Sequence, residues 1–174
     1  LAIEPTNTLV LDYNLSLKWL AYTLEMPDFL GRAKVNEQGQ ILYEDRSPHQ
    51  WRRVRYSYMD ARRYANLRGL TIRGPRKIWD SSLAGIGLLY AKEQGNFPAY
   101  NSRVYEEFWR RELNIEDQEA IKVILSETGS DTANFETYVS EEGRLLHDKI
   151  RIEAEEKGVF GVPTYILDDE IFWG

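Results

Sequence analysis

The last seventeen residues, GVFGVPTYILDDEIFWG at 158–174, decide the fold. Two runs of β-forming residues, Thr164–Leu167 and Glu170–Trp173, flank the turn residues Asp168-Asp169. This pattern predicts a β-hairpin, with the second turn residue in a left-handed conformation where glycine is the common choice. A hairpin alone is marginal in water, so it needs another sheet or helix to pack on. For Pro163, the sequence alone favours a trans bond at the start of a strand.

The composition is that of a globular protein, with 43% hydrophobic and 29% charged residues among 174. This length suits one domain, or one domain with a large insertion. No apolar run reaches the ~18 residues of a membrane span, and no signal peptide is visible at the start. The chain has no cysteine, which excludes disulfides and thiolate metal sites within it and is compatible with the cytoplasmic location that we expect. His49 and His147 lack ligand spacing, so we expect ordinary polar residues and no metal.

Charge is distributed unevenly along a chain whose net charge is −6. Between Arg46 and Lys77 there are ten basic residues against one acid, Asp60. The acidic remainder argues against a nucleic-acid partner, and nothing indicates a membrane partner. An arginine cluster suits a small anionic ligand, because guanidinium binds carboxylates in a bidentate manner. The alternative is a solvated helix face that carries arginine by chance.

The pattern of apolar residues predicts an α/β chain with a block of helices between strands. Ile3–Leu15 is ambiguous between strand and helix, Ser16–Leu24 reads as a strand, and 26–48 reads as a long loop. Helices are expected at Trp51–Leu67, from Asp80 or Ser81 to Gln94, at Asn101–Arg111, at Glu116–Thr128 with Asn114 as cap, at Asp131–Glu141 and from there to Lys157.

Three stretches, in this order and spacing, carry a resemblance. The first is LAIEP at 1–5 with WLAY at 19–22, and the second is Arg53-x-x-Tyr56-x-x-x-Asp60-x-x-Arg63-Tyr64-Ala65. The third is GVFGVPT at 158–164, followed by the hairpin and its final Phe-Trp-Gly. Together they resemble the DsbA-like thioredoxin superfamily, in the branch that holds 2-hydroxychromene-2-carboxylate isomerases and kappa-class glutathione transferases. The chain departs from that branch at Asp80-Ser81, where isomerases usually have Asn.

The resemblance implies a thioredoxin-like fold with a large α-helical insertion. Its expected parts are 1–26 as the first half of the thioredoxin-like unit, 27–142 as loop and helical insertion, and 143–174 as the second half. It also implies a cis Val162–Pro163 bond at the mouth of a pocket, which leaves the backbone of Val162 facing the ligand. A peptide-like thiol such as glutathione can pair there as an added strand would. Glutathione is thus the implied co-substrate, bound by Val162 and Pro163, and a homodimer is expected.

The resemblance further implies two family segments outside 1–174. One is a first strand with a Ser-Pro-aromatic motif before Leu1, whose serine faces the glutathione sulfur. The other is an Asp-containing turn and a closing helix after Gly174. We therefore expect no catalytic residue within the chain, and no isomerase activity unless both segments are restored. Without the first strand, the strands at Ser16–Leu24 and Thr164–Leu167 are expected to meet directly or to be bridged by another chain or a swapped segment.

The leading functional hypothesis is a glutathione-dependent isomerase that acts on a small aromatic carboxylate. Carboxylate-binding candidates are Arg53, Arg63 and Arg76, whose guanidinium groups suit that role. Tyr56 is a further candidate, unless it and Asp60 serve to fix their helix, in which Asp60 is expected to pair with an arginine. Trp51 and Trp79 could wall an aromatic pocket, or belong to the core.

Two other classes remain open at this point. One is a DsbA-type thiol-disulfide oxidoreductase whose active cysteine precedes residue 1, and the other is a catalytically silent binding or scaffold protein. A Ser-Pro motif before Leu1 would favour the isomerase or transferase, and Cys-x-x-Cys would favour the oxidoreductase. Absence of glutathione binding in calorimetry would favour the silent protein.

Overall fold

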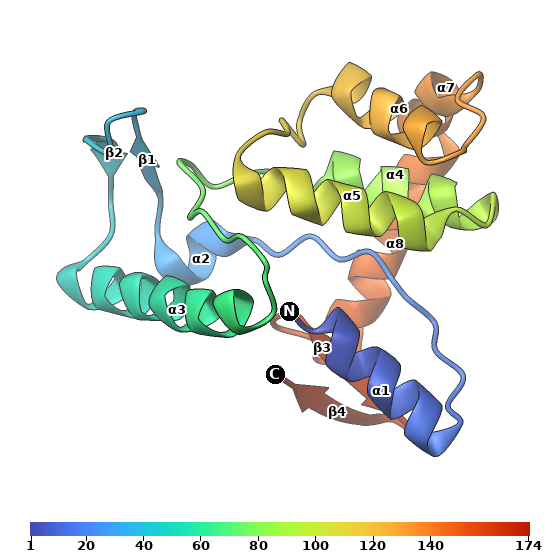
Figure 1. The fold of residues 1–174 in the computed structure, drawn as a ribbon, viewed down its shortest axis with the longest axis horizontal. Coiled ribbons are helices and arrows are strands. Elements are labelled where there is room, and N and C mark those ends of the chain that lie inside the picture. The colour runs from blue at the N-terminus through green and yellow to red at the C-terminus, as the bar shows by residue number, and fades with distance from the viewer.

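The computed structural model describes the whole chain except the side chains of residues 28 and 29. Its elements (Figure 1) are α1 Ile3–Tyr13, α2 Met26–Leu30, β1 Ala33–Val35, β2 Ile41–Glu44, α3 Pro48–Leu67, α4 Ser82–Glu93, α5 Phe97–Arg110, α6 Gln118–Glu127, α7 Phe135–Ser140, α8 Glu142–Glu156, β3 Thr164–Leu167 and β4 Glu170–Trp173. None of the helices so described is both long and apolar enough to cross a membrane.

The core lies in the block formed by α4 to α8, with α4 at its centre. Small and apolar residues nearly surround α4, and such a helix is buried on most sides. Gly87 lets α4 pack closely on its neighbours, because a Cβ there would meet the hydroxyl of Tyr100 and lie 2.9 Å from Ile121 Cγ2. The Tyr100 hydroxyl in turn donates a hydrogen bond of 2.9 Å to the backbone oxygen of Ala84. The helix predicted from Asp80 or Ser81 to Gln94 is confirmed, and most of its residues are buried.

The two ends of the chain form a second region, in which α1 lies beside the β3–β4 hairpin (Figure 1). A hydrogen bond of 2.8 Å between the hydroxyls of Thr6 and Tyr165 joins α1 to β3. The predicted hairpin is confirmed, with Thr164 opposite Trp173 and Leu167 opposite Glu170. Both turn residues, Asp168 and Asp169, are left-handed, with φ of 48° and 67°.

The predicted strand at Ser16–Leu24 is wrong, because the segment between α1 and α2 is irregular. Strand residues need a hydrogen-bonded neighbour, and among the described residues β3 pairs only with β4. The expected direct meeting of the two strands is therefore not seen. The segment is instead held through single contacts, such as the hydrogen bond of 2.7 Å from Lys92 Nζ to the backbone oxygen of Trp19. The ambiguous stretch before it is the helix α1.

The predicted long loop at 26–48 is also wrong, because it holds α2 and the hairpin β1–β2. Asn36 closes the hairpin turn, where its Oδ1 accepts a hydrogen bond of 2.9 Å from the Gln40 backbone N–H. Gly39 supplies the positive φ of 80° that this turn requires. All residues of β2 are exposed, so no alternation of apolar and polar residues marks it in the sequence.

The remaining helices form where expected, with shifted ends. α3 begins at Pro48, before the predicted Trp51, because Ser47 and Gln50 form a capping box. α5 begins at Phe97 with a proline in its first turn, and Asp117, in place of Asn114, caps α6.

Candidate functional site

The Val162–Pro163 bond at the start of β3 is cis, as the resemblance implied. Val162 is 49% exposed, and neither its N–H nor its C=O makes a hydrogen bond to any residue described. Next to it, the backbone oxygen of Gly161 accepts a hydrogen bond of 2.6 Å from Thr164 Oγ1. The predicted pocket mouth at Pro163 is not confirmed, since neither of the two best-formed hollows in the described part of the chain includes this residue.

The larger of these hollows, of about 370 Å³, lies between the segment 23–27, the start of α4 and the middle of α8. One wall is apolar and consists of Leu24, Pro27, Ile78 and Trp79. The rest of the lining, called here the polar wall, carries hydroxyl, imidazole and charged groups, which come from Thr23, Glu25, Asp80, Ser82, Arg144, His147, Asp148 and Arg151. Ligand pockets of this size usually have a mostly apolar lining, whereas this hollow is lined mainly by polar and charged groups. We take it as the candidate binding site because these groups meet a small apolar surface in one hollow.

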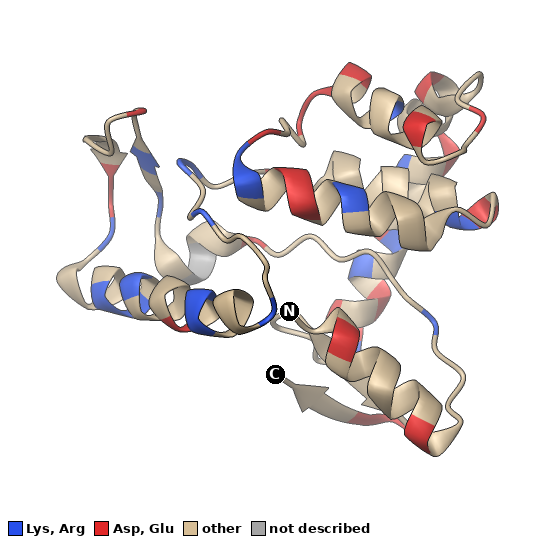
Figure 2. Cartoon of the chain, in the orientation of Figure 1, with Lys and Arg blue, Asp and Glu red and all other residues tan. Residues whose placement is uncertain are grey.

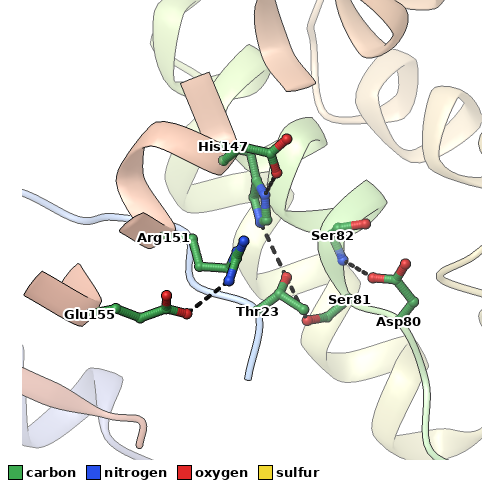
Figure 3. Close-up of polar contacts among 8 residues, drawn as sticks. Thr23, Asp80, Ser81, Ser82, His147, Arg151 and Glu155 are labelled. Carbon is green, nitrogen blue, oxygen red and sulfur yellow. Dashed lines mark hydrogen bonds and ion pairs between the residues drawn. The ribbon is translucent and has the colours of Figure 1, made fainter. Parts of the chain in front are cut away.

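His147 is the most deeply buried residue of the polar wall, with only 2% of its surface exposed (Figure 3). Its Nε2 lies 3.1 Å from Thr23 Oγ1, which accepts a second hydrogen bond of 3.2 Å from Ser81 Oγ. Its Nδ1 is buried and makes no hydrogen bond, and it lies 3.5 Å from Asp148 Oδ1. This residue was expected to be an ordinary polar histidine. The helical spacing of Gly143, His147 and Ile150, the buried positions of α8, is the signal that could have revealed it.

Charges around the hollow shift two of its titratable groups. Burial lowers the pKa of His147 and Arg144 acts in the same direction, whereas Asp148 and Asp80 oppose them. Burial would raise the pKa of Asp80, but hydrogen bonds from Ser82 and the nearby charges of Arg144 and His147 hold it below its usual value. At neutral pH the wall thus presents a neutral imidazole beside an ionised carboxylate.

The arginines of the wall differ in their partners. Arg151 Nη1 forms an ion pair of 2.9 Å with Glu155 Oε1 (Figure 3). Arg144 is half-buried and has neither a hydrogen bond nor an ion pair with any described residue. The described residues include no group of three or more His, Cys, Asp or Glu side chains that could hold a metal ion.

The predicted residues of the arginine cluster lie elsewhere, on the exposed face of α3. Figure 2 shows Lys and Arg recurring along this helix. Arg63 pairs with Asp60 at 3.4 Å, as expected from their spacing. Arg53 and Tyr56 are exposed on the same helix, and no residue of α3 lines the hollow.

Of the other candidates, only Trp79 reaches the hollow. Its ring also packs edge-on against Phe108, at 6.0 Å between centroids, so it belongs to the core as well. Trp51 donates a hydrogen bond to Glu44 and lies under the guanidinium of Arg46, 4.9 Å from its ring. Arg76 Nη1 pairs with Glu37 at 3.3 Å, outside the hollow.

The comparisons with known proteins concern the fold and the family of the chain. The chain is 29% identical over 178 residues to 2-hydroxychromene-2-carboxylate isomerase of Pseudomonas putida, and the match covers all of this chain and 81% of the relative. It is 27% identical over 177 residues to the enzyme of the same name from Pseudomonas sp. (strain C18), across all of this chain and 78% of the relative.

A solved structure of selenomethionine 2-hydroxychromene-2-carboxylate isomerase superimposes with a TM-score of 0.69 at 23% identity, over 98% of this chain and 79% of that one. The expected thioredoxin-like fold with a helical insertion is therefore confirmed. Because the model of the DSBA-like thioredoxin domain matches residues 18–174, the chain belongs to that family.

Proposed function

We propose that this protein is a glutathione-dependent isomerase that acts on a small aromatic carboxylate. The observation that carries the proposal is the exposed Val162, whose backbone N–H and C=O have no partner among the described residues. It is supported by the relatives that are named 2-hydroxychromene-2-carboxylate isomerase and match the chain from end to end.

Unpaired backbone groups at the start of a strand suit a peptide ligand, which adds to them as a further strand. The cysteinyl residue of glutathione is such a ligand, with its own N–H and C=O to exchange with Val162. In this chemistry the glutathione thiolate is the nucleophile, and it adds reversibly to the substrate. The contribution of the protein is to hold thiol and substrate in a reactive orientation.

Glutathione binding tests this proposal directly. Titration of the protein with reduced glutathione, followed by amide NMR, is expected to shift the Val162 and Thr164 signals most. Val162→Asp places a negative charge against the carboxylates of glutathione and should weaken binding about tenfold or more, or ~1.4 kcal/mol. Val123→Asp is the matched control, since Val123 is 53% exposed and lies on α6.

Activity supplies the second arm of the test. Turnover of 2-hydroxychromene-2-carboxylate by the full-length protein should require glutathione and should fall in Val162→Asp but not in Val123→Asp. Turnover that is independent of glutathione, or equal in the two variants, would contradict the proposal.

A further inference from the structure

The hollow beside α8 has both kinds of lining that an aromatic acid requires. Its apolar residues, which include Trp79 and Ile78, offer a surface for a ring. Its polar residues, which include Arg144 and His147, line the same hollow. A volume of about 370 Å³ lies within the range of small-molecule pockets.

Arg144 is the free cation of this wall among the described residues. Arg151, about two turns away on the same helix face, is neutralised by Glu155 at 2.9 Å. Arg144 acts electrostatically on both Asp80 and His147, which places its charge next to the hollow. A half-buried guanidinium without a partner is a ready site for a carboxylate, which it binds through paired N–H donors.

His147 supplies a second basic group. Its Nδ1 is buried without a hydrogen bond, and the Asp148 carboxylate lies 3.5 Å from it. Its Nε2 lies 3.1 Å from Thr23 Oγ1, which accepts a hydrogen bond of 3.2 Å from Ser81. Buried polar atoms are nearly always paired, so an unpaired nitrogen in the lining of a hollow calls for an explanation. A ligand that carries negative charge would favour the protonated imidazole and so repay its burial.

We propose that Arg144 binds the carboxylate of a small aromatic acid in this hollow, and that His147 gains a proton when the acid is bound. The inference deepens the proposed function, because it rests on that function for the identity of the substrate, but the binding itself requires no glutathione. It also moves the carboxylate site from α3, where the sequence placed it, to α8. The ring of the acid would pack on Trp79 and Ile78, which line the same hollow as the two basic groups.

The affinity for the acid should increase as the pH falls. In the free protein, burial and Arg144 lower the pKa of His147, so the imidazole is neutral near pH 7. A bound carboxylate raises that pKa, and by linkage the carboxylate binds more tightly where the imidazole is protonated. The other charged groups that line the hollow are Arg144, Asp148 and Arg151 from α8, Asp80 from the start of α4 and Glu25 from the segment before α2.

The test uses benzoate as the probe and NMR of the two histidines as the readout. Benzoate should shift the His147 imidazole signals but leave those of His49, an exposed residue of α3 and an internal reference. Arg144→Gln should weaken benzoate binding about tenfold, and Arg144→Lys should weaken it less, because lysine keeps the charge but loses the paired donors. Arg52→Gln, an exposed arginine of α3, is the matched control and should leave binding unchanged.

A thermal melt of each variant shows that it is folded, and His147→Gln should remove the pH dependence of benzoate binding. Equal benzoate affinity in Arg144→Gln and Arg52→Gln, or no shift at His147, would overturn the inference. Those outcomes leave the proposed function standing if glutathione still binds at Val162. If benzoate binding depends on Arg144 but glutathione does not bind, the carboxylate site survives and the proposed function fails.

Discussion

Phe135 and Phe172 are the same side chain in two very different regions. Phe135 begins α7 and is fully buried, with its ring 5.2 Å from that of Tyr90. Phe172 lies on β4 and is 51% exposed. The contrast extends to their surroundings, because α4 to α8 enclose a continuous apolar cluster, whereas α1 and the β3–β4 hairpin expose many large apolar side chains.

The difference separates the part of the molecule that stabilises the fold from the part that contains the proposed glutathione site. Stability resides in the helical block, whose contacts are made between neighbouring helices. The unpaired backbone groups of Val162, where we propose that glutathione binds, belong to the weakly packed end region. The hollow lies at the junction, since α8 runs from the helical block to the hairpin (Figure 1).

The largest expected effect compares the two phenylalanines directly. Phe135→Ala removes a fully buried ring and should cost about 3–5 kcal/mol of the free energy of unfolding. Phe172→Ala removes a ring that is half in water and should cost less than about 1.5 kcal/mol, since little area is returned to solvent. Urea denaturation of both variants measures the two values. Similar losses would show that the end region is packed as tightly as the helical block.

Two glycine substitutions compare a tightly packed position of the helical block with a loosely packed position outside it. Gly87→Ala would force a methyl group against the Tyr100 hydroxyl and to 2.9 Å from Ile121 Cγ2. Overpacking of this kind costs about 1–3 kcal/mol. Gly74→Ala is the control, because its Cβ would come no closer than 3.8 Å to the ring of Tyr58. Thermal unfolding should rank Gly87→Ala well below Gly74→Ala, and an equal midpoint would mean that the contact between α4 and α5 is loose.

The pH dependence of stability tests the environment of His147 in the hollow. His147 has a folded-state pKa below its ordinary value of 6.5, so the unfolded chain binds the proton more readily. Stability from the neutral imidazole is therefore present above pH 6.5 and is lost as the pH falls from there toward the folded-state pKa. Each unit of pKa shift corresponds to about 1.4 kcal/mol. The free energy of unfolding should thus fall more steeply with acid in the wild type than in His147→Gln, and parallel curves would refute it.

How far the sequence predicts each region follows from the same contrast. The helices around α4 could be predicted because their apolar residues recur at helical spacing, and the hairpin because Asp168-Asp169 separates two β-forming runs. The segment Ser16–Leu24 has β-forming residues but no strand partner, and local pattern carries no information on partners. The exposed hairpin β1–β2 has no buried face to leave a pattern.

The candidate hollow could not be predicted from the sequence. The resemblance predicts Val162 and Pro163 as ligand-binding residues, because they stand next to each other in one motif, but neither lines the hollow. The hollow joins Thr23, Asp80 and His147, which are far apart in the chain and meet only when α4 packs on α8. The arginines of α3 drew attention by their number, but Arg144 and Arg151, on the mixed helix α8, are the arginines that line the hollow.

The smallest effect is expected in the hairpin turn, and it tests whether the end region opens independently. Asp168 and Asp169 both have positive φ, at 48° and 67°, a conformation that costs a residue with a Cβ roughly 1 kcal/mol and costs glycine little. Asp169→Gly creates the Asp-Gly pair that such two-residue turns prefer, so it should stabilise the hairpin by about 0.5–1 kcal/mol. If the hairpin opens separately from the helical block, hydrogen exchange at Tyr165 and Phe172, a directly opposed pair of β3 and β4, should slow while exchange at Ile121 and Leu125 stays unchanged. Slower exchange at all four amides would show that the two regions unfold as one unit, and faster exchange in the hairpin would show that Asp169 makes a favourable contact that glycine loses.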